Sequence, residues 1–129
     1  MIYNWTKHDI TIQSVNGVVV NIPSSGIDAR VRTTEYDGGR IRKEVGGVEY
    51  EFAMTQVTTH EIVGIEVKSG RIIELPKLSD DDIAIVSTMV KDQFPNDRRI
   101  VAPNTGETAV RSEGRILYVR SFVSTRVEG

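Results

Sequence analysis

Apolar and polar residues alternate along most of the first 75 positions, and this period of two predicts a series of short β-strands. In residues 9–14, isoleucines alternate with polar side chains, so one face of the strand would be buried. The Asn16-Gly17 pair that follows is typical of a tight hairpin turn, because both turn positions tolerate a positive φ. Residues 18–22 are therefore predicted to form the returning strand of a hairpin.

Glycine-rich turns divide the next part of the chain into five further predicted strands. These strands cover residues 27–36, 40–45, 48–57, 61–67 and 71–75. Asp37-Gly38-Gly39 is interpreted as a turn between strands, Gly46-Gly47 as a tight hairpin turn and Ser69-Gly70 as a further turn. Thr58-Thr59-His60 is expected to end the hairpin that Gly46-Gly47 closes.

The predicted hairpin around Gly46-Gly47 has a charged face. Arg40 and Arg42 on one strand would lie across from Glu49 and Glu51 on the other. Cross-strand pairs of opposite charge contribute roughly 0.2–1 kcal/mol each. We therefore expect ion pairs across this hairpin.

Residues 79–95 differ from the rest of the chain and contain the predicted helical structure. Two interpretations compete. In the first, a single helix is capped by Ser79, with acidic residues favourably placed near its N-terminus. In the second, residues 82–86 form a strand, because they are rich in β-branched side chains, and Ser87 or Thr88 caps a shorter helix that a proline ends. We prefer the second interpretation.

The last third of the chain is predicted to contain a short strand and a hairpin. Residues 98–102 form the strand, which Pro103 follows. Residues 108–111 and 115–126 flank Ser112-Glu113-Gly114, whose last two residues suit a hairpin turn. The strand over residues 115–126 would be long, with side chains alternating between its two faces.

Together these elements predict an α+β fold that is mainly antiparallel β-sheet, built from hairpins in a roll or a sandwich, with one or two short helices around residues 80–95. No repeat, linker or low-complexity tract is visible, so residues 1–129 are expected to form a single domain. A chain of this size has an unfavourable ratio of surface to volume, which oligomerisation would improve.

Composition narrows the expected partners and compartment. A net charge of −2 and a pI near 5.7 argue against binding to DNA or RNA polymers or to a membrane surface. The chain has no cysteine, which excludes disulfides, thiol catalysis and zinc sites of the cysteine type. Because neither a signal peptide nor an apolar run of about 20 residues is visible, we expect a cytoplasmic protein.

No pattern typical of a catalytic or metal site is visible. His8 and His60 lie in separate turn-like segments, and their spacing gives no support to a zinc site. Asp80, Asp81 and Asp82 could attract a divalent cation, but neighbours on one turn converge poorly on an ion, and an acidic helix start is the simpler interpretation. We expect no metal, no cofactor and no enzymatic activity.

The arginines of the last third make this part of an acidic chain locally basic. They are Arg98, Arg99, Arg111, Arg115, Arg120 and Arg126. Guanidinium groups match phosphate geometry and stack on bases. Phe94 could add a stacking face, and the turn Asn104-Thr105-Gly106 could contact a base edge or a ribose. These residues predict a small pocket for a phosphorylated nucleotide. The alternative is a core phenylalanine, an ordinary turn and arginines paired with carboxylates.

Several short motifs resemble those of small phage-encoded proteins, and the resemblance covers most of the chain. They are Asn4-Trp5-Thr6-Lys7-His8-Asp9-Ile10, Ile22-Pro23-Ser24-Ser25-Gly26, Asp97-Arg98-Arg99-Ile100-Val101-Ala102-Pro103-Asn104-Thr105-Gly106 and Ala109-Val110-Arg111. On these motifs the chain resembles the first-described phage anti-defence family that acts against the Thoeris immune system.

The resemblance implies a sponge rather than an enzyme, acting in the cytoplasm of the host bacterium. The family sequesters cyclic ADP-ribose isomers made by TIR-domain immune proteins, binds cyclic oligonucleotides at a separate site, and holds ligand between the protomers of dimers or higher oligomers. Its pocket uses a Phe and an Asn ten positions apart, which Phe94 and Asn104 match. Two arginines six positions apart match Arg120 and Arg126, and Arg30 and Arg111 correspond more loosely.

Two other functions remain open from the sequence. A small phage structural or assembly protein would use its β-rich chain to pack against copies of itself. A nucleotide-degrading enzyme would need a general acid or base, and the sequence shows no signature of one. The enzyme is therefore the least supported of the three functions.

Overall fold

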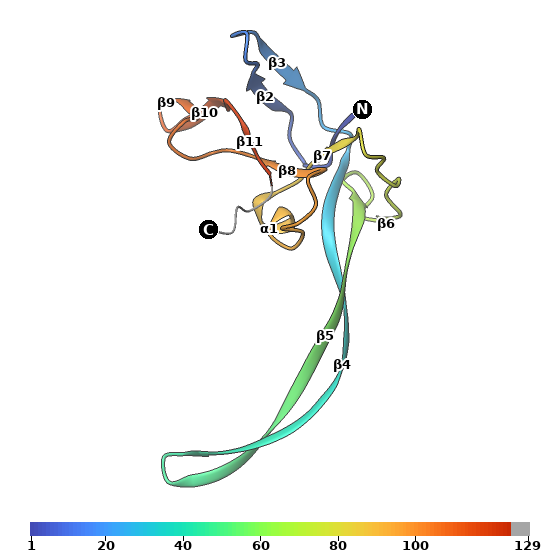
Figure 1. Cartoon of the computed structure of the whole chain (residues 1–129), viewed down its shortest axis with the longest axis vertical. Coiled ribbons are helices and arrows are strands. Elements are labelled where there is room, and N and C mark those ends of the chain that lie inside the picture. The colour runs from blue at the N-terminus through green and yellow to red at the C-terminus, as the bar shows by residue number, and fades with distance from the viewer. Residues whose placement is uncertain (125–129) are drawn as a thin grey trace. The chain divides into compact units, whose positions relative to one another are not determined.

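The computed structural model describes residues 1–124, apart from the side chains of residues 58–60 (Figure 1). The predicted site residue Arg126 lies outside the described residues. Most of the described chain is β-strand, with one short helix. The elements are β1 (Ile2–Asn4), β2 (Ile10–Gln13), β3 (Val19–Ile22), β4 (Ile27–Val45), β5 (Val48–Glu66), β6 (Ile72–Ile73), β7 (Ile83–Ile85), α1 (Thr88–Lys91), β8 (Ile100–Pro103), β9 (Val110–Ser112), β10 (Arg115–Tyr118) and β11 (Phe122–Val123).

The fold class agrees with the prediction, because the structure is mainly antiparallel β-sheet with a single helix near residue 90. The chain divides into two compact units. The first contains residues 1–30 and 62–129, and the second, which we call the arm, contains Val31–Glu61. The expectation of one domain over residues 1–129 stays a prediction.

The core of the first unit surrounds a four-stranded sheet in the order β1-β7-β8-β11. The pairs β1–β7 and β7–β8 are parallel, and only β8–β11 is antiparallel. These parallel pairs were not predicted. Ala84, Ile85 and Val86 are fully buried, in agreement with the continuous apolar run that a strand covered on both faces requires.

The segment after β7 confirms the preferred interpretation of a strand followed by a short helix, although α1 ends at Lys91, before the proline that was expected to end it. Ser87 has an extended backbone, and its hydroxyl accepts a hydrogen bond from the Val90 N–H at 3.4 Å, so it is the N-cap of α1. The alternative of one helix starting at Ser79 is wrong. The β-branched residues of β7 gain more by joining the sheet than by extending a helix.

The N-terminal segment is fixed by a buried asparagine. Asn4 is 2% exposed, and its side-chain amide donates to the carbonyls of His8 and Ile22, both at 3.0 Å. Its side-chain oxygen accepts from the backbone N–H and the hydroxyl of Thr6. Next to it, Trp5 is buried and stacks on Tyr3 with ring centroids 5.5 Å apart. This network joins β1 to the start of the β2–β3 hairpin, which forms as predicted.

The arm is a two-stranded antiparallel ribbon made from the distal parts of β4 and β5 (Figure 1). The predicted turn at Asp37-Gly38-Gly39 is wrong, since β4 runs through it. Gly39 takes a φ of +86° and donates its N–H to the Asp37 carboxylate, so the triplet distorts the strand without reversing it. The predicted end at Thr58-Thr59-His60 is also wrong, because β5 continues to Glu66.

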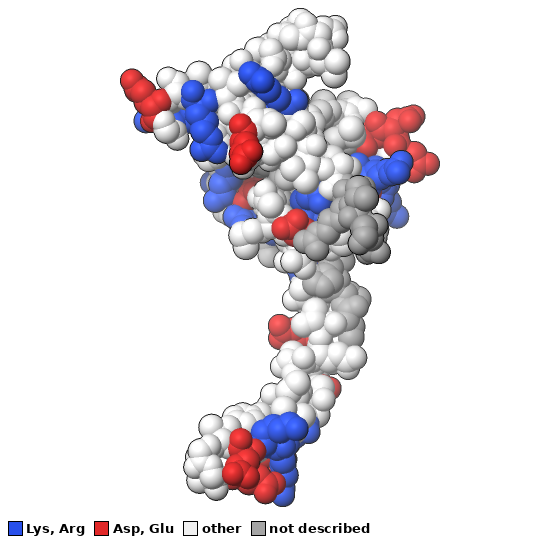
Figure 2. Space-filling view, turned by 60° about the vertical axis from the view of Figure 1, so that its left-hand side comes forward, with Lys and Arg blue, Asp and Glu red and all other residues white. Residues whose placement is uncertain are grey.

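The tip of the arm agrees with the sequence prediction. Gly46 and Gly47 have φ values of +61° and +83°, as a tight hairpin turn between twisted strands requires. The predicted cross-strand ion pairs are present: Arg40 lies 3.6 Å from Glu51, and Arg42 lies 3.7 Å from Glu49. Basic and acidic side chains are therefore side by side at this end of the arm (Figure 2).

The C-terminal hairpin forms as predicted, but its second strand is short. β9 and β10 pair across Glu113 and Gly114, both of which have positive φ. The predicted long strand over residues 115–126 is wrong within the described residues. The register shifts after Ile116, β10 ends at Tyr118, and the chain crosses to pair β11 with β8. Side chains on either side of this break do not share one regular alternation.

Candidate functional site

The predicted Asn104-Thr105-Gly106 turn is a loop held by its own side chain. The Asn104 side-chain oxygen accepts from the Gly106 N–H at 3.2 Å, while its amide nitrogen donates to the Ser121 hydroxyl at 3.1 Å. The Asn104 N–H also donates to the Ser121 carbonyl at 3.0 Å. The asparagine thus ties the loop to the segment that leads into β11, and this loop begins where β8 ends.

Arg111 closes the same loop from β9. One of its terminal guanidinium nitrogens donates to the Thr105 carbonyl at 2.5 Å. The side chain is exposed, and a guanidinium has five N–H donors, so donors remain beyond the one that binds Thr105. The structure brings Asn104, Thr105, Gly106 and Arg111 together, as the nucleotide-pocket hypothesis requires.

Arg120 joins this group through its neighbours in sequence. Val119 before it is buried, donates its N–H to the Thr11 carbonyl and accepts from the Gln13 N–H, both at 2.9 Å. Ser121 after it holds Asn104. The backbone at Arg120 is therefore fixed from both sides, while its side chain is exposed and has no ion pair or hydrogen bond among the described residues. We call Asn104, Thr105, Gly106, Arg111 and Arg120 the loop cluster.

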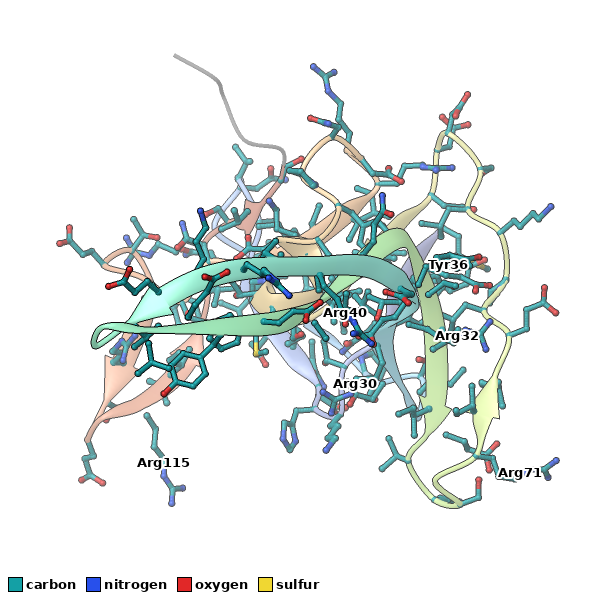
Figure 3. All side chains as sticks on the ribbon, turned by 90° about the horizontal axis from the view of Figure 1, so that it is seen from below. Arg30, Arg32, Tyr36, Arg40, Arg71 and Arg115 are labelled. Carbon is teal, nitrogen blue, oxygen red and sulfur yellow. The ribbon has the colours of Figure 1, made fainter. Side chains whose placement is uncertain are left out.

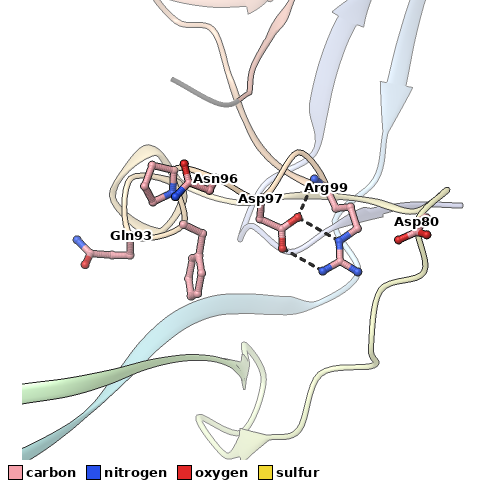
Figure 4. Close-up of a pocket in the computed structure, with 7 residues that line it drawn as sticks. Asp80, Gln93, Asn96, Asp97 and Arg99 are labelled. Atoms are coloured by element: carbon pink, nitrogen blue, oxygen red, sulfur yellow. Dashed lines mark hydrogen bonds and ion pairs between the residues drawn. The ribbon is translucent and has the colours of Figure 1, made fainter. Parts of the chain in front are cut away.

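Phe94 lies in a different place, an open depression in the first unit (Figure 4). This depression has a volume of about 580 Å³, and Phe94 is half-buried in it. The residues that line it are Asp80, Gln93, Phe94, Pro95, Asn96, Asp97 and Arg99. None of the loop cluster lines this depression. The structure therefore does not bring Phe94 and Asn104 into one cavity, in spite of their spacing.

Charge in the depression is set by a tight pair. Arg99 donates through Nε and one terminal nitrogen to the two Asp97 carboxylate oxygens, at 3.0 and 3.1 Å (Figure 4). Its other terminal nitrogen donates to the Leu78 carbonyl at 2.6 Å. These bonds lower the pKa of Asp97 and raise that of Arg99. The Asp97 carboxylate balances the positive charge of Arg99, and Asp80 adds a second carboxylate. This depression therefore suits an uncharged ring better than a phosphate.

Arg30 also lies apart from the loop cluster. Its guanidinium is 2.7 Å from the carboxylate of Asp28, whose side chain is only 11% exposed. Arg115, by contrast, projects away from the ribbon (Figure 3). Some described arginines, such as Arg30 and Arg99, therefore have carboxylate partners, whereas Arg111 and Arg120 have none among the described residues.

Sequence reasoning missed the polar lining of the depression. Gln93 and Asn96 line the depression together with Phe94, and Asp97 sets the position of Arg99. The Asp97–Arg99 spacing was visible in the sequence, but two residues apart is an ordinary distance in a loop. The Leu78 carbonyl that completes the arrangement is far away in the chain.

Two features are absent from the described residues. No group of three or more histidine, cysteine or acidic side chains among them could hold a metal ion. No helix in this part of the chain is long and apolar enough to cross a membrane. Comparison of the chain with family models, curated proteins and solved structures found no match.

Proposed function

We propose that this protein binds a phosphorylated nucleotide at the loop cluster and holds it without cleaving it. The observation that carries the proposal is Arg120, whose exposed guanidinium extends from a backbone that hydrogen bonds fix on both sides. The fixed backbone limits where this cation can reach, and its free donors are available to an anion. Arg111 adds a second guanidinium beside a loop whose shape Asn104 sets through its bonds to Gly106 and Ser121.

Phe94 has a separate part in the proposal. Its half-buried ring, in a depression that Gln93 and Asn96 also line, suits a stacked base, whereas the nearby carboxylates disfavour phosphate. Base and phosphate would then be bound by different surfaces. A homodimer or higher homo-oligomer could place the depression of one copy against the loop cluster of another, with each site repeated by symmetry.

The sequence motifs extend the proposal to a biological role. Their resemblance to the phage anti-defence family leads us to propose that the ligands are immune signals of the cyclic ADP-ribose type or cyclic oligonucleotides. The protein would sequester these signals in the host cytoplasm, so that their effector stays inactive. Because of this resemblance, Arg30 and Arg126 also remain candidate ligand-binding residues.

Calorimetry with cyclic ADP-ribose isomers and cyclic oligonucleotides tests the proposal. We expect binding by the natural chain, and a loss of affinity of roughly tenfold or more for Arg120→Gln, because a charged hydrogen bond to phosphate is removed. Arg115→Gln is the matched control, since it removes the same charge from a side chain outside the cluster. Absence of binding to every ligand would overturn the proposal, and so would recovery of a cleaved ligand by mass spectrometry.

A second candidate function is that of a phage structural or assembly protein. The observation that favours it is the arm, whose exposed apolar residues would suit packing between copies. Co-sedimentation of the protein with phage particles, together with no nucleotide binding, would support this candidate over the first.

A further inference from the structure

The turn between β2 and β3 has no part in the proposed function. Gly17 has a φ of +88°, and its N–H donates to the Ser14 carbonyl at 2.9 Å. The Ser14 N–H donates to the Val18 carbonyl at 2.7 Å, which closes the turn. Asn16 therefore lies at the tip of a hairpin, directly before a residue that has no side chain.

This tip has little packing to hold it. Residues 14–21 are all exposed, and Val15 is fully so. A turn with few apolar contacts opens locally at a low cost in free energy, while the core of the protein stays folded. The hydrogen bond from Gly17 to Ser14 can therefore break without unfolding of the chain.

Asn16 differs from the other asparagines in its surroundings. The side chains of Asn4, Asn21 and Asn104 make hydrogen bonds, whereas that of Asn16 makes none among the described residues. Asn96 is also exposed and without a side-chain hydrogen bond in this part of the chain, but Asp97 follows it. Only Asn16 is followed by glycine, whose backbone nitrogen no Cβ shields from a close approach.

We propose that Asn16 is a site of spontaneous covalent modification in the folded chain, which converts it to aspartate and isoaspartate. The Gly17 backbone nitrogen attacks the side-chain carbonyl carbon of Asn16, and the new C–N bond closes a five-membered succinimide ring. The bond from that carbon to the side-chain nitrogen breaks, and ammonia leaves with the proton of the Gly17 N–H. Water then opens the ring at either of its two carbonyls.

The closed turn slows the first step, because the Gly17 N–H is bound to the Ser14 carbonyl. Local opening of the turn must precede the attack, so the folded chain should react more slowly than the unfolded chain. It should still react faster at Asn16 than at Asn96, because the amide nitrogen after Asn96 belongs to a residue with a side chain.

The product alters the hairpin. Isoaspartate adds a methylene group to the main chain and a negative charge to the tip, and the geometry of a turn fixes the register of its hairpin. The effect extends to the segment before Arg120, because the Gln13 N–H donates to the Val119 carbonyl at 2.9 Å. Conversion of Asn16 should therefore weaken the backbone hydrogen bonds between β2 and Val119.

Peptide mapping by mass spectrometry tests the modification after incubation of the folded chain in a mildly alkaline buffer. We expect a mass gain of about 1 Da in the peptide that contains Asn16. Its rate should be roughly tenfold or more above that of the Asn96 peptide, the control within the same chain. Methyl transfer by an isoaspartyl methyltransferase counts the isoaspartate.

Asn16→Gln is the matched variant, because its longer side chain would have to close a six-membered ring, which forms far more slowly. It should show neither the mass gain nor the methyl transfer at this position. Equal rates at Asn16 and Asn96 would overturn the inference. So would conversion of Asn16 in urea-unfolded chain with none in the folded chain.

Hydrogen exchange of the separated isoaspartyl fraction tests the effect on the hairpin. The amides of Gln13 and Val119 should exchange several-fold faster than in the fresh chain. The Ala84 amide, which donates to the Arg99 carbonyl at 2.7 Å in the core sheet, is the control and should not change. Unchanged exchange at Gln13 and Val119 would contradict the coupling. Both measurements are made without nucleotide, so they fail or succeed separately from the proposed function.

Discussion

Arg99 and Asp97 form a two-point ion pair although only one residue separates them, and the Asp97 carboxylate also accepts the Arg99 backbone N–H at 3.0 Å. The remaining guanidinium nitrogen reaches the Leu78 carbonyl at 2.6 Å. A single arginine thereby connects the loop after α1 to the segment before β7. This connection forms one wall of the Phe94 depression.

Replacing this arginine should destabilise the protein. A lysine at position 99 cannot donate two parallel hydrogen bonds and a third to Leu78, so we expect Arg99→Lys to cost about 1–2 kcal/mol of unfolding free energy in urea titrations. Arg98→Lys is the control, because Arg98 is the exposed neighbour in sequence. Equal stability of the two variants would contradict the assignment of the pair.

Stability should fall in acid through Asp97 and Asp82. Hydrogen bonds from Arg99 lower the pKa of Asp97, and the Ser79 N–H lowers that of Asp82, followed by the N-terminal amine 3.1 Å away. Both carboxyls lose their protons more readily in the folded chain than in the unfolded one. Their contribution is therefore present above the ordinary aspartate pKa of about 3.9 and is lost as the pH falls through the lower folded values.

Urea titrations between pH 7 and pH 3 measure this dependence. Asp97→Asn should be less stable than the natural chain at pH 7 and should lose less stability on acidification. Asp81→Asn, which changes an exposed neighbour of Asp82, is the control and should follow the natural chain. An acid slope for Asp97→Asn as steep as that of the natural chain would contradict the role of this carboxyl.

Asn4 should be among the least replaceable polar residues. Asn4→Ala removes two donors and one acceptor from a buried site and leaves the carbonyls of His8 and Ile22 without those partners. We expect a loss of about 2–3 kcal/mol in unfolding free energy. Asn96→Ala changes an exposed position, and its loss of unfolding free energy should be only a few tenths of the loss for Asn4→Ala. A similar small loss for both variants would show that the Asn4 network has little weight.

One substitution should stabilise the chain. Glu113 has a φ of +52° in the turn between β9 and β10, a conformation that side chains with a Cβ disfavour. Glu113→Gly should relieve this strain and raise the unfolding free energy by about 0.5–1 kcal/mol. Position 107 lies in a loop and has no positive φ, so Glu107→Gly should lower the unfolding free energy. A destabilised Glu113→Gly chain would indicate that the turn conformation depends on the glutamate side chain.

Part of the candidate site could be predicted from the sequence. The Asn104-Thr105-Gly106 turn and its closure by Arg111 depend on residues within eight positions of each other, which local preferences control. The position of Phe94 could not be predicted in this way. Its spacing from Asn104 matches a family pattern, yet the chain between them turns into β8 and places the two residues in separate surroundings.

By itself, the sequence determined the features that depend on residues close together along the chain. Glycine pairs set the hairpin turns, Ser87 set the start of α1, and alternation set the ion pairs of the arm. Tertiary structure alone decided the parallel pairing of β1, β7 and β8, the run of β4 through Asp37-Gly38-Gly39, and the bond from Asn104 to Ser121. A short apolar run can pair in either direction, so the free energy of burial in the complete core makes the choice.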